Sequence, residues 1–313
     1  MTTPKQLAII VPAYNEEAIL EMSAAKLTAL LESMIREGLI RSDSYICFVN
    51  DGSRDKTWQI IENLSSKDKY IKGIKLARNF GHQSALLAGL YDMQAELYVS
   101  IDADLQDDEN TIRSMVLKNQ EGFDVVYGVR AKREVDTFFK RATALGFYKL
   151  MDIMGVRTVY NHADFRLLSH RAIEALKQFP ETNLFLRGLV PLIGFSSASV
   201  FYDRKARVAG ETKYPLKKML SFAWEGITSF SVKPLKIATL MGFFMCIAGF
   251  FFLLYSVWAH YYGHTVSGWT SLIVSIYFLG GVQLFCIGII GEYIGKIYKE
   301  VKHRPRFIIE KKV

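Results

Sequence analysis

The feature that most constrains this chain is a long stretch without charge toward its C-terminus. From Ile237 through Gly291 the sequence contains no Asp, Glu, Lys or Arg. A bilayer core is crossed by about 20 apolar helical residues, so this stretch is long enough for two crossings. A polar hinge at 260–268 divides it, and we expect one span at 235–259 and another at 269–291. The alternative is a buried hairpin, which would require two long uncharged helices side by side in a soluble core.

Basic residues flank the uncharged stretch on both sides. Lys233 and Lys236 precede it and a basic segment follows it, whereas the hinge contains neither Lys nor Arg. By the positive-inside rule both flanks are cytoplasmic. We therefore expect an integral protein of the cytoplasmic (inner) membrane, with the N-terminal domain and both termini in the cytoplasm. No signal peptide is expected, because the first residues lead directly into a strand-like run.

The position of the surplus basic residues in the sequence indicates what they bind. The 313 residues include 39 Lys and Arg against 31 Asp and Glu, which gives a net charge of +8. Much of the surplus lies in the tail at 295–313, next to the second span, where anionic lipid headgroups are the expected partner. This placement does not predict a nucleic-acid groove, so we expect no nucleic-acid partner.

Apolar runs and helical patterns alternate in the first 130 residues. The expected strands cover 7–11, 45–49, 71–76, 97–101 and 124–129, and the expected helices include 16–38, 57–64 and 83–94. Short connections of this kind form right-handed βαβ crossovers, so we expect an α/β fold with a mostly parallel, Rossmann-like sheet. Ligands of such sheets bind beyond the carboxyl ends of the strands.

The rest of the chain suggests the following boundaries. A cytoplasmic domain is expected at 1–214, including a basic amphipathic helix at about 137–155. That helix fits a lipid surface, with packing against a core as the alternative. A juxtamembrane amphipathic helix is expected at 215–234, two transmembrane helices at 235–294, and a basic cytoplasmic tail at 295–313.

A pair of carboxylates follows the fourth expected strand. Asp102 and Asp104 are two positions apart, so both can reach one cation whose remaining ligands are phosphate oxygens and water. Oxygen ligands of this kind suit Mg²⁺ or Mn²⁺. For the next acids, Asp107 and Asp108, capping of a helix is an equally good explanation.

Two further polar motifs close the first and second expected strands. They read VPAYNEE at 11–17 and NDGS at 50–53. Pro12 fixes the backbone, Tyr14 offers a stacking face, and the acids can accept hydrogen bonds from a base or ribose. The NDGS segment also fits an ordinary turn, so the combination of motifs on successive strand ends carries the prediction of a nucleotide site.

These motifs together resemble a known family. VPAYNEE, NDGS, RNFGH at 78–82, DADLQ at 102–106 and ADFRL at 163–167 are similar to the family two glycosyltransferases of the GT-A fold. Among these, the chain most resembles the polyprenyl-phosphate type, which includes bactoprenol glucosyltransferases and dolichol-phosphate mannose synthases. The resemblance extends over nearly the whole chain, including the two spans and the stretch 291–305.

The resemblance implies a metal-dependent, inverting transfer of one hexose from a nucleotide-sugar donor to a polyprenyl phosphate. The expected reaction joins glucose from UDP-glucose to undecaprenyl phosphate at the cytoplasmic membrane face, for cell-envelope glycosylation. A GDP-mannose-dependent mannose synthase is the alternative within the family. A processive polysaccharide synthase is disfavoured because no Gln-x-x-Arg-Trp string occurs here. A non-enzymatic membrane subunit would not need acids clustered at strand ends.

Matching positions imply roles for individual residues. The donor nucleotide would contact Pro12, Ala13, Tyr14, Glu16, Asp51, Asp102, Ala103, Arg207 and Lys213. The metal and diphosphate would be held by Asp102, Asp104 and Gln106, and the lipid phosphate by Arg130 and Arg141. Asp104, Asp164 and Arg166 would form the catalytic group.

Two points qualify this assignment. Many relatives have Asp where this chain has Asn50, which affects the expected base or ribose contact and leaves the metal pair unchanged. A lipid phosphate is already anionic at neutral pH, so we expect Asp164 to position groups rather than to remove a proton.

The spacing of Gly281 and Gly288, and of Gly291 and Gly295, is compatible with helix association in a homo-oligomer.

Overall fold

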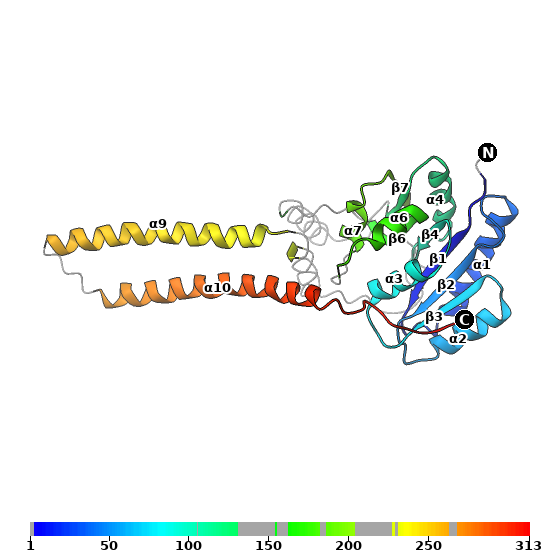
Figure 1. The fold of residues 1–313 in the computed structure, drawn as a ribbon, viewed down its shortest axis with the longest axis horizontal. Coiled ribbons are helices and arrows are strands. Elements are labelled where there is room, and N and C mark those ends of the chain that lie inside the picture. Colours follow the sequence, from blue (N-terminus) through cyan, green and yellow to red (C-terminus); the bar gives the residue numbers. More distant parts are fainter. Residues whose placement is uncertain are drawn as a thin grey trace. The chain divides into compact units, whose positions relative to one another are not determined.

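A computed structural model describes residues 3–104, 106–130, 154, 162–181, 186–203, 227–228, 231–262 and 268–313. The chain forms two compact units, both drawn in Figure 1. The first unit consists of Met1–Tyr148, Arg157–Pro215 and Arg304–Val313, and the second of Lys149–Val156 and Leu216–His303. The C-terminal residues thus belong to the same unit as the N-terminal domain.

The first unit is built on one mixed sheet of eight strands in the order β7-β5-β6-β4-β1-β2-β3-β8. Its strands are β1 (Leu7–Ala13), β2 (Tyr45–Asn50), β3 (Ile71–Leu76), β4 (Leu97–Ser100), β5 (Val125–Arg130), β6 (His162–Ser169), β7 (Ser197–Tyr202) and β8 (Ile309–Lys312). Only β6 and β8 run antiparallel to their neighbours among these strands. The expected mostly parallel α/β sheet is confirmed.

Helices cover both faces of this sheet, which explains why β1 is buried along its whole length. The helices of the unit are α1 (Leu20–Arg36), α2 (Thr57–Lys67), α3 (His82–Asp92), α4 (Thr111–Gln120), α6 (His170–Lys177) and α7 (Leu186–Leu192). Leu7, Ile9 and Val11 of β1 share one hydrophobic core with α1, α2 and α4. On the other face, α3 packs so closely that a Cβ at Gly89 would lie 2.4 Å from the side chain of Ile10.

The five strands and three helices expected from the sequence are present, with ends shifted by a few residues. The strands β6, β7 and β8 and the helices α4, α6 and α7 were not predicted. Strand β8 is the least expected of these, because its residues Ile309–Lys312 belong to the segment interpreted as a basic tail.

Strand β8 completes the sheet beside β3. Gly73 and Val313 exchange two backbone hydrogen bonds, at 2.8 and 2.9 Å. Two lysines of the tail form ion pairs with other elements of this unit: Lys311 with Glu62 of α2 at 2.6 Å, and Lys312 with Asp92 of α3 at 2.5 Å. Part of the tail's positive charge is therefore used within the protein.

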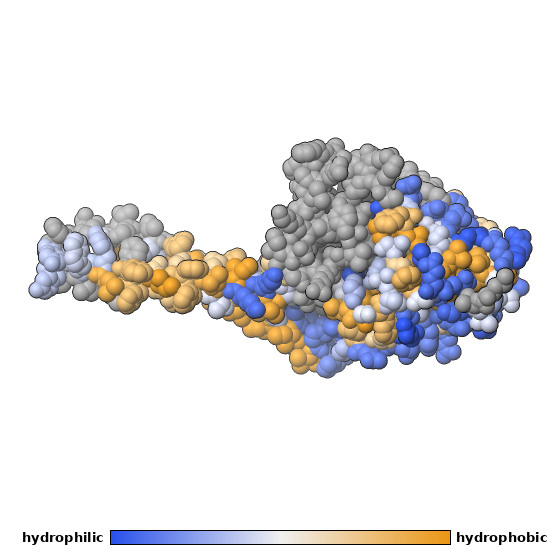
Figure 2. All heavy atoms as spheres, turned by 90° about the horizontal axis from the view of Figure 1, so that it is seen from above, coloured by the Kyte–Doolittle hydropathy of each residue, from blue (hydrophilic) through white to orange (hydrophobic). Residues whose placement is uncertain are grey.

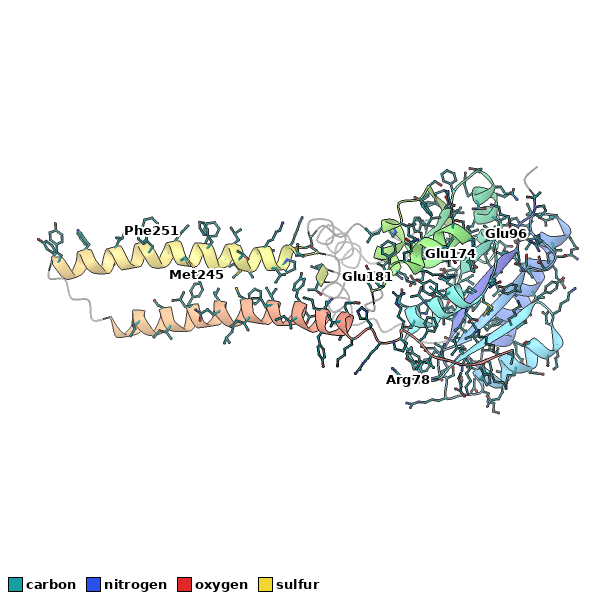
Figure 3. All side chains as sticks on the ribbon, viewed as in Figure 1. Arg78, Glu96, Glu174, Glu181, Met245 and Phe251 are labelled. Atoms are coloured by element: carbon teal, nitrogen blue, oxygen red, sulfur yellow. The ribbon has the colours of Figure 1, made fainter. Side chains whose placement is uncertain are left out.

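The second unit contains two long apolar helices, α9 (Lys233–Tyr261) and α10 (Trp269–Val301). Each includes a stretch long and apolar enough to cross a membrane, Lys233–Phe251 and Phe278–Val301, and few residues of either stretch are buried. Apolar residues cover much of the visible helical surface in Figure 2, and the Phe251 side chain points away from α10 in Figure 3. Such surfaces need an apolar environment outside the chain.

Contacts between α9 and α10 hold them as an antiparallel pair. The Cys286 thiol lies 3.8 Å from the carbonyl oxygen of Ala238, and the Tyr293 hydroxyl donates to the carbonyl of Ser231. Both helices extend beyond the expected spans, α10 by about three turns. The amphipathic helix expected at about 137–155 and the juxtamembrane helix expected at 215–234 lie almost entirely outside the described residues.

Candidate active site

Chain direction brings the polar motifs to one edge of the sheet. Strands β1 to β5 and β7 point the same way, and β6 runs against them. The start of β6 therefore lies beside the ends of its neighbours β4 and β5. This arrangement explains how the ADFRL motif, distant in sequence, comes close to the DADLQ motif.

The motifs after β1 and β2 interlock through backbone donors. The backbone N–H of Asn15 donates to Ser53 Oγ at 3.0 Å, and that of Arg54 donates to Asn15 Oδ1 at 2.9 Å. The backbone N–H of Glu16 donates to Thr57 Oγ1 at 2.9 Å. Asn15 has a φ of 56°, a left-handed conformation that Asn tolerates better than most residues. The two motifs thus form one connected surface.

The residues expected to contact the nucleotide at the end of β1 differ in how far their side chains are exposed. Pro12 and Ala13 lie inside the strand, opposite Val49 and Asn50 of β2, and Ala13 is buried. The Tyr14 ring lies just beyond the strand and is 41% exposed. Tyr14 therefore offers an exposed stacking face, whereas Pro12 and Ala13 are part of the sheet.

Asp51 uses its carboxylate to hold the next loop. Its Oδ1 accepts the backbone N–H of Phe80 at 2.7 Å, and its Oδ2 accepts that of Gly81 at 2.9 Å. Asp51 is buried, and burial raises its pKa despite these two donors. The NDGS and RNFGH motifs are therefore parts of one structure in which Asp51 orders the loop before α3.

Asp102 lies at the centre of a group of acids beyond β4. Burial and the nearby carboxylates of Asp164, Asp107 and Asp104 raise the pKa of Asp102 to about 6. His82 opposes this shift, with its Nε2 atom 3.6 Å from Asp102 Oδ1. A bound cation would oppose both the cost of burying this charge and the smaller repulsion from the other acids.

The residues after Asp102 support this interpretation. Ala103 and Gln106 are buried, and the backbone N–H of Gln106 donates to Asp104 Oδ1 at 3.1 Å. Among the described residues, no three His, Cys, Asp or Glu side chains gather closely enough to hold a metal by themselves. The donor set thus fits a cation that takes two protein carboxylates and completes its shell with diphosphate oxygens and water.

Asp164, at the start of β6, is surrounded by donors from three elements. Arg166 donates to Oδ1, and Arg187 donates to Oδ2 at 3.2 Å and, through Nε, to Oδ1 at 3.4 Å. Gln83 of α3 donates to Oδ2 at 3.3 Å. Burial opposes ionisation, yet Arg187 and Arg166 outweigh it and hold the pKa of Asp164 well below its usual range. His82 Nε2 lies 4.0 Å from Oδ2.

These contacts also fix the start of α7. The Arg166 side chain is 2% exposed and donates to the carbonyl oxygen of Leu186 at 3.2 Å. Gln83 Oε1 accepts the backbone N–H of Leu186 at 3.3 Å. Arg166 is therefore buried and supports Asp164 and α7, and its role beside the reacting atoms, implied by the family resemblance, stays a prediction.

Arg130, at the end of β5, forms an ion pair with Asp107. Its Nη2 lies 3.4 Å from Asp107 Oδ1, which also accepts the Tyr202 hydroxyl of β7 at 2.6 Å. Asp107 is buried, and the Arg130 side chain is 26% exposed. Asp107 thus joins β5 and β7 through side chains, while Arg130 keeps a partly exposed surface at the expected edge.

The remaining expected contacts, Arg141, Arg207 and Lys213, lie outside the described residues. The sequence analysis quoted His82 in the RNFGH motif without giving it a role, and it missed Gln83 and Arg187. Gln83 directly follows this motif, which was a usable signal. Arg187 had none, because its link to Asp164 exists only in the folded chain.

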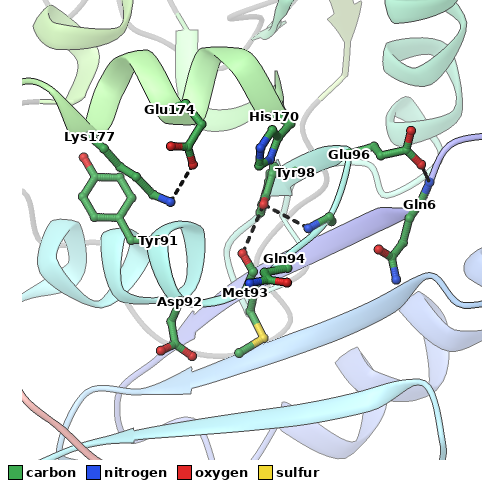
Figure 4. A pocket seen from close by; sticks show the side chains of 11 residues that line it. Gln6, Tyr91, Asp92, Met93, Gln94, Glu96, Tyr98, His170, Glu174 and Lys177 are labelled. Atoms are coloured by element: carbon green, nitrogen blue, oxygen red, sulfur yellow. Dashed lines mark hydrogen bonds and ion pairs between the residues drawn. The ribbon is translucent and has the colours of Figure 1, made fainter.

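A separate cavity of about 370 Å³ lies at the opposite end of the strands (Figure 4). Its wall includes the end of α3, the residues before β1 and β4, and α6. Lys177 is paired with Glu174 at 2.7 Å, and Glu96 accepts the backbone N–H of Gln6 at 3.0 Å. Asp92, which also lines the cavity, pairs with Lys312 of β8, and the cavity is remote from the motif edge.

Comparison with known proteins identifies the two parts of the chain. The family model described as glycosyl transferase family 2 matches residues 8–177, and the model described as the GtrB C-terminal hairpin matches residues 233–297. The chain belongs to glycosyl transferase family 2. It is a glycosyltransferase with the expected GT-A fold, and the motif edge of its sheet lies within the region that the family model matches.

Relatives of this glycosyltransferase align over nearly its full length. The uncharacterized glycosyltransferase YkoT of Bacillus subtilis is 55% identical, over 97% of this chain and 91% of the relative. The SfII prophage-derived bactoprenol glucosyl transferase of Shigella flexneri is 40% identical, over 98% of each chain. Among solved structures, the mannosyltransferase PcManGT of Pyrobaculum calidifontis has a TM-score of 0.48 and 16% identity, covering 94% of this chain and 88% of its own.

Proposed function

We propose that this glycosyltransferase moves one glucosyl group from UDP-glucose to undecaprenyl phosphate, with inversion at the anomeric carbon. The observation that carries the proposal is the joining, in one chain, of a family 2 domain and a GtrB-type hairpin. Relatives named bactoprenol glucosyl transferase are 39–40% identical over 97–98% of this chain. An oxygen of the lipid phosphate would bond to the anomeric carbon as the bond to the nucleoside diphosphate breaks.

The nucleotide would lie on the connected surface after β1 and β2. Tyr14 offers an exposed ring for stacking on the base, and Glu16 follows it at the same edge. Asp51 would act through the loop that it orders, since both its oxygens accept backbone N–H groups. Arg207 and Lys213 would complete the donor site on the segment after β7.

The acid pair would hold a divalent cation, Mg²⁺ or Mn²⁺. Asp102 and Asp104 supply carboxylate oxygens, and Gln106 supports Asp104 through its backbone N–H. Such a cation supplies neutralisation of the charge that develops on the leaving diphosphate. Burial, with a smaller contribution from Asp164, Asp107 and Asp104, raises the pKa of Asp102, and a cation beside Asp102 and Asp104 would favour their carboxylate forms.

Asp164 would position groups around the reacting centre and would not accept a proton. Two guanidinium groups and an amide donate to its oxygens, and its pKa lies well below the usual range. A phosphate nucleophile is already anionic, so the reaction makes no demand for a strong base. Arg130 and Arg141 would attract the lipid phosphate, and Arg130 has a partly exposed side chain at the correct edge.

The hairpin would span the membrane, and the fold restricts how it can do so. Strand β8 follows α10 in the chain and pairs with β3 of the catalytic sheet. Both ends of the hairpin are therefore joined by the chain to the catalytic unit, which supports an arrangement with both ends on one side of the bilayer. Lys233 and Lys236 in the first turn of α9, and the lysines near the end of α10, support the proposal that this side is the cytoplasmic one.

Lipid labelling tests the proposal directly. Membranes containing the full chain, undecaprenyl phosphate and Mg²⁺ are given radiolabelled UDP-glucose or GDP-mannose, and the lipid phase is extracted. Label from UDP-glucose alone, abolished by EDTA and absent with Asp104→Asn, is the expected result. Label from GDP-mannose alone would identify a mannose synthase instead. No label from either donor, with inserted and folded protein, would contradict the proposal.

A further inference from the structure

Arg130 and Tyr202 are neighbours across the sheet, at the edge where the motifs lie. Arg130 is the last residue of β5 and Tyr202 the last of β7, and the parallel register of the two strands pairs them directly. The Arg130 side chain is 26% exposed, whereas Tyr202 is 5% exposed. A buried tyrosine thus lies beside the arginine expected to contact the lipid phosphate.

One carboxylate oxygen links the two side chains. Asp107 Oδ1 accepts the Tyr202 hydroxyl at 2.6 Å and lies 3.4 Å from Arg130 Nη2. Burial and the Asp107 carboxylate raise the pKa of Tyr202, so its hydroxyl stays protonated and remains a donor. Tyr202 therefore makes the shorter of two contacts with the oxygen that it shares with Arg130.

This sharing affects how strongly Asp107 attracts the Arg130 guanidinium. A buried carboxylate attracts a cation more strongly than an exposed one, because the protein interior has a low dielectric constant. The Asp107 side chain is 2% exposed, and the Tyr202 hydroxyl stabilises part of its charge. The hydroxyl therefore weakens the attraction, which keeps Arg130 at its longer contact and nearer to the edge.

The Tyr202 ring is itself fixed by the ADFRL motif on β6. It packs edge-on against Phe165, with ring centroids 5.4 Å apart and an interplanar angle of 81°. Phe165 directly follows Asp164, is buried, and belongs to the same hydrophobic core as Tyr202. The hydroxyl is thus in place before a ligand arrives, which lowers the entropy cost of binding.

We propose that Tyr202 and Asp107 are positioning residues that place the Arg130 guanidinium for the phosphate of the lipid acceptor. The inference rests on the proposed function, because Arg130 is assigned there to undecaprenyl phosphate. Neither Tyr202 nor Asp107 touches the lipid in this arrangement, and both act through Arg130. Without the hydroxyl, Asp107 would attract the guanidinium inward, away from the phosphate.

Equilibrium binding to a variant that lacks one oxygen atom tests the inference. Full-length protein in detergent is titrated with undecaprenyl phosphate, with undecaprenol, which has no phosphate, and with UDP in the presence of Mg²⁺. Tyr202→Phe removes the hydroxyl and keeps the ring. It should weaken binding of undecaprenyl phosphate about 3- to 10-fold and leave binding of undecaprenol and UDP unchanged.

Tyr45→Phe is the matched control. Tyr45 is also buried and donates its hydroxyl at 2.8 Å, to the carbonyl oxygen of Gln94, but it begins β2 at the opposite end of the strands. This variant should have a lower unfolding temperature and bind every ligand as the wild type does. If Tyr45→Phe loses as much affinity for undecaprenyl phosphate as Tyr202→Phe, the effect is one of general stability and the inference is overturned.

A double-variant cycle shows whether Tyr202 acts through Arg130. Arg130→Gln should weaken binding of undecaprenyl phosphate, and adding Tyr202→Phe to it should cause no further loss, because the group that the hydroxyl places is gone. Equal losses in the two backgrounds would contradict the inference. Asp107→Asn removes the charge that attracts Arg130 and should show the same dependence on Arg130, so the test does not require Tyr202→Phe to fold.

The binding results also separate this inference from the assigned reaction. If no lipid is labelled but Tyr202→Phe weakens binding of undecaprenyl phosphate through Arg130, only the reaction assignment fails. If transfer is intact and Tyr202→Phe binds undecaprenyl phosphate as the wild type does, only the inference fails. A loss of affinity for UDP in place of the lipid would assign Arg130 to the donor and would also overturn the inference.

Discussion

Asp51 determines where Gly81 lies, because Asp51 Oδ2 accepts the backbone N–H of Gly81 at 2.9 Å. Gly81 has a φ of 92° and directly precedes α3, whose first residues His82 and Gln83 approach Asp164. A carboxylate that the sequence suggested as a ligand for nucleotide thus connects the second strand to the centre of the site. The link runs entirely through protein atoms.

Asp51→Asn should therefore damage the site without touching a substrate. One carboxylate oxygen becomes an NH₂ group that faces a backbone N–H, which leaves a buried donor unpaired at a cost of about 1 to 3 kcal/mol. We expect a lower unfolding temperature and a reduced rate of transfer. Differential scanning fluorimetry gives the unfolding temperature of Asp51→Asn. The control is Asp43→Asn, the same substitution at an exposed aspartate. Equal unfolding temperatures for the two variants would contradict it.

A glycine pair offers a test of the contact between the two loops. Gly52 has a φ of 64°, and a Cβ there would lie 2.4 Å from the backbone carbon of Arg78. Gly38 has a φ of 68° with nothing within 4 Å of its Cβ position. Gly38→Ala should cost about 1 to 2 kcal/mol from the left-handed backbone alone. Gly52→Ala should cost roughly 3 kcal/mol or more. Equal effects in chemical denaturation would show that the loops separate easily.

Replacing one member of the acid pair should remove activity and leave the fold intact. Asp104→Asn takes away a carboxylate oxygen proposed for the cation, and we expect turnover to fall about 10²- to 10³-fold. Asp108→Asn changes the same group four positions later and should remain active. The measurement is initial rate against Mg²⁺ concentration, with unfolding temperature recorded for both. Normal rates in folded Asp104→Asn protein would exclude the metal role.

Acid should destabilise the catalytic domain partly through Asp124. Its carboxylate accepts from Arg171, Ser169 and Ser196, and the bond from Arg171 is the main reason that its pKa lies below the usual value. A group with a lowered folded-state pKa stabilises the protein above its unfolded pKa, about 3.9, and loses that contribution as the pH falls through the folded value. Asp124→Asn should flatten the fall in stability below about pH 4. The test is the unfolding temperature of the wild type and of Asp124→Asn, measured at several pH values across this range. If the two proteins lose stability equally as the pH falls, the prediction is wrong.

Removing β8 should expose an edge of the sheet. A chain ending at Ile308 loses the backbone bonds between Gly73 and Val313 and the ion pairs of Lys311 and Lys312. Unpaired edges recruit other strands, so we expect lower stability and aggregation. Lys311→Gln should have little effect, because its pair is exposed. Size-exclusion profiles of the three proteins in detergent check the difference, and a monodisperse truncated protein would refute it.

The sequence was sufficient to predict elements whose pattern is local. The runs that became β1, β2 and β4 are apolar and end at polar motifs, so both their positions and the functional edge followed from them. Strand β8 was not predictable in this way, because IEKK has no apolar alternation and pairs with β3 more than 200 residues earlier. Asp164 was found by its motif, but its partners Gln83 and Arg187 come from α3 and α7 and meet it only after folding.

The place of β8 in the chain also has a consequence for how the protein is made. A ribosome that has completed β7 has synthesised seven of the eight strands, and the last one emerges only after α9 and α10. Until then β3 keeps an open edge, so the catalytic domain cannot finish folding before the hairpin has been translated. Synthesis thereby orders the two events: the helices are available to the membrane before the sheet is closed.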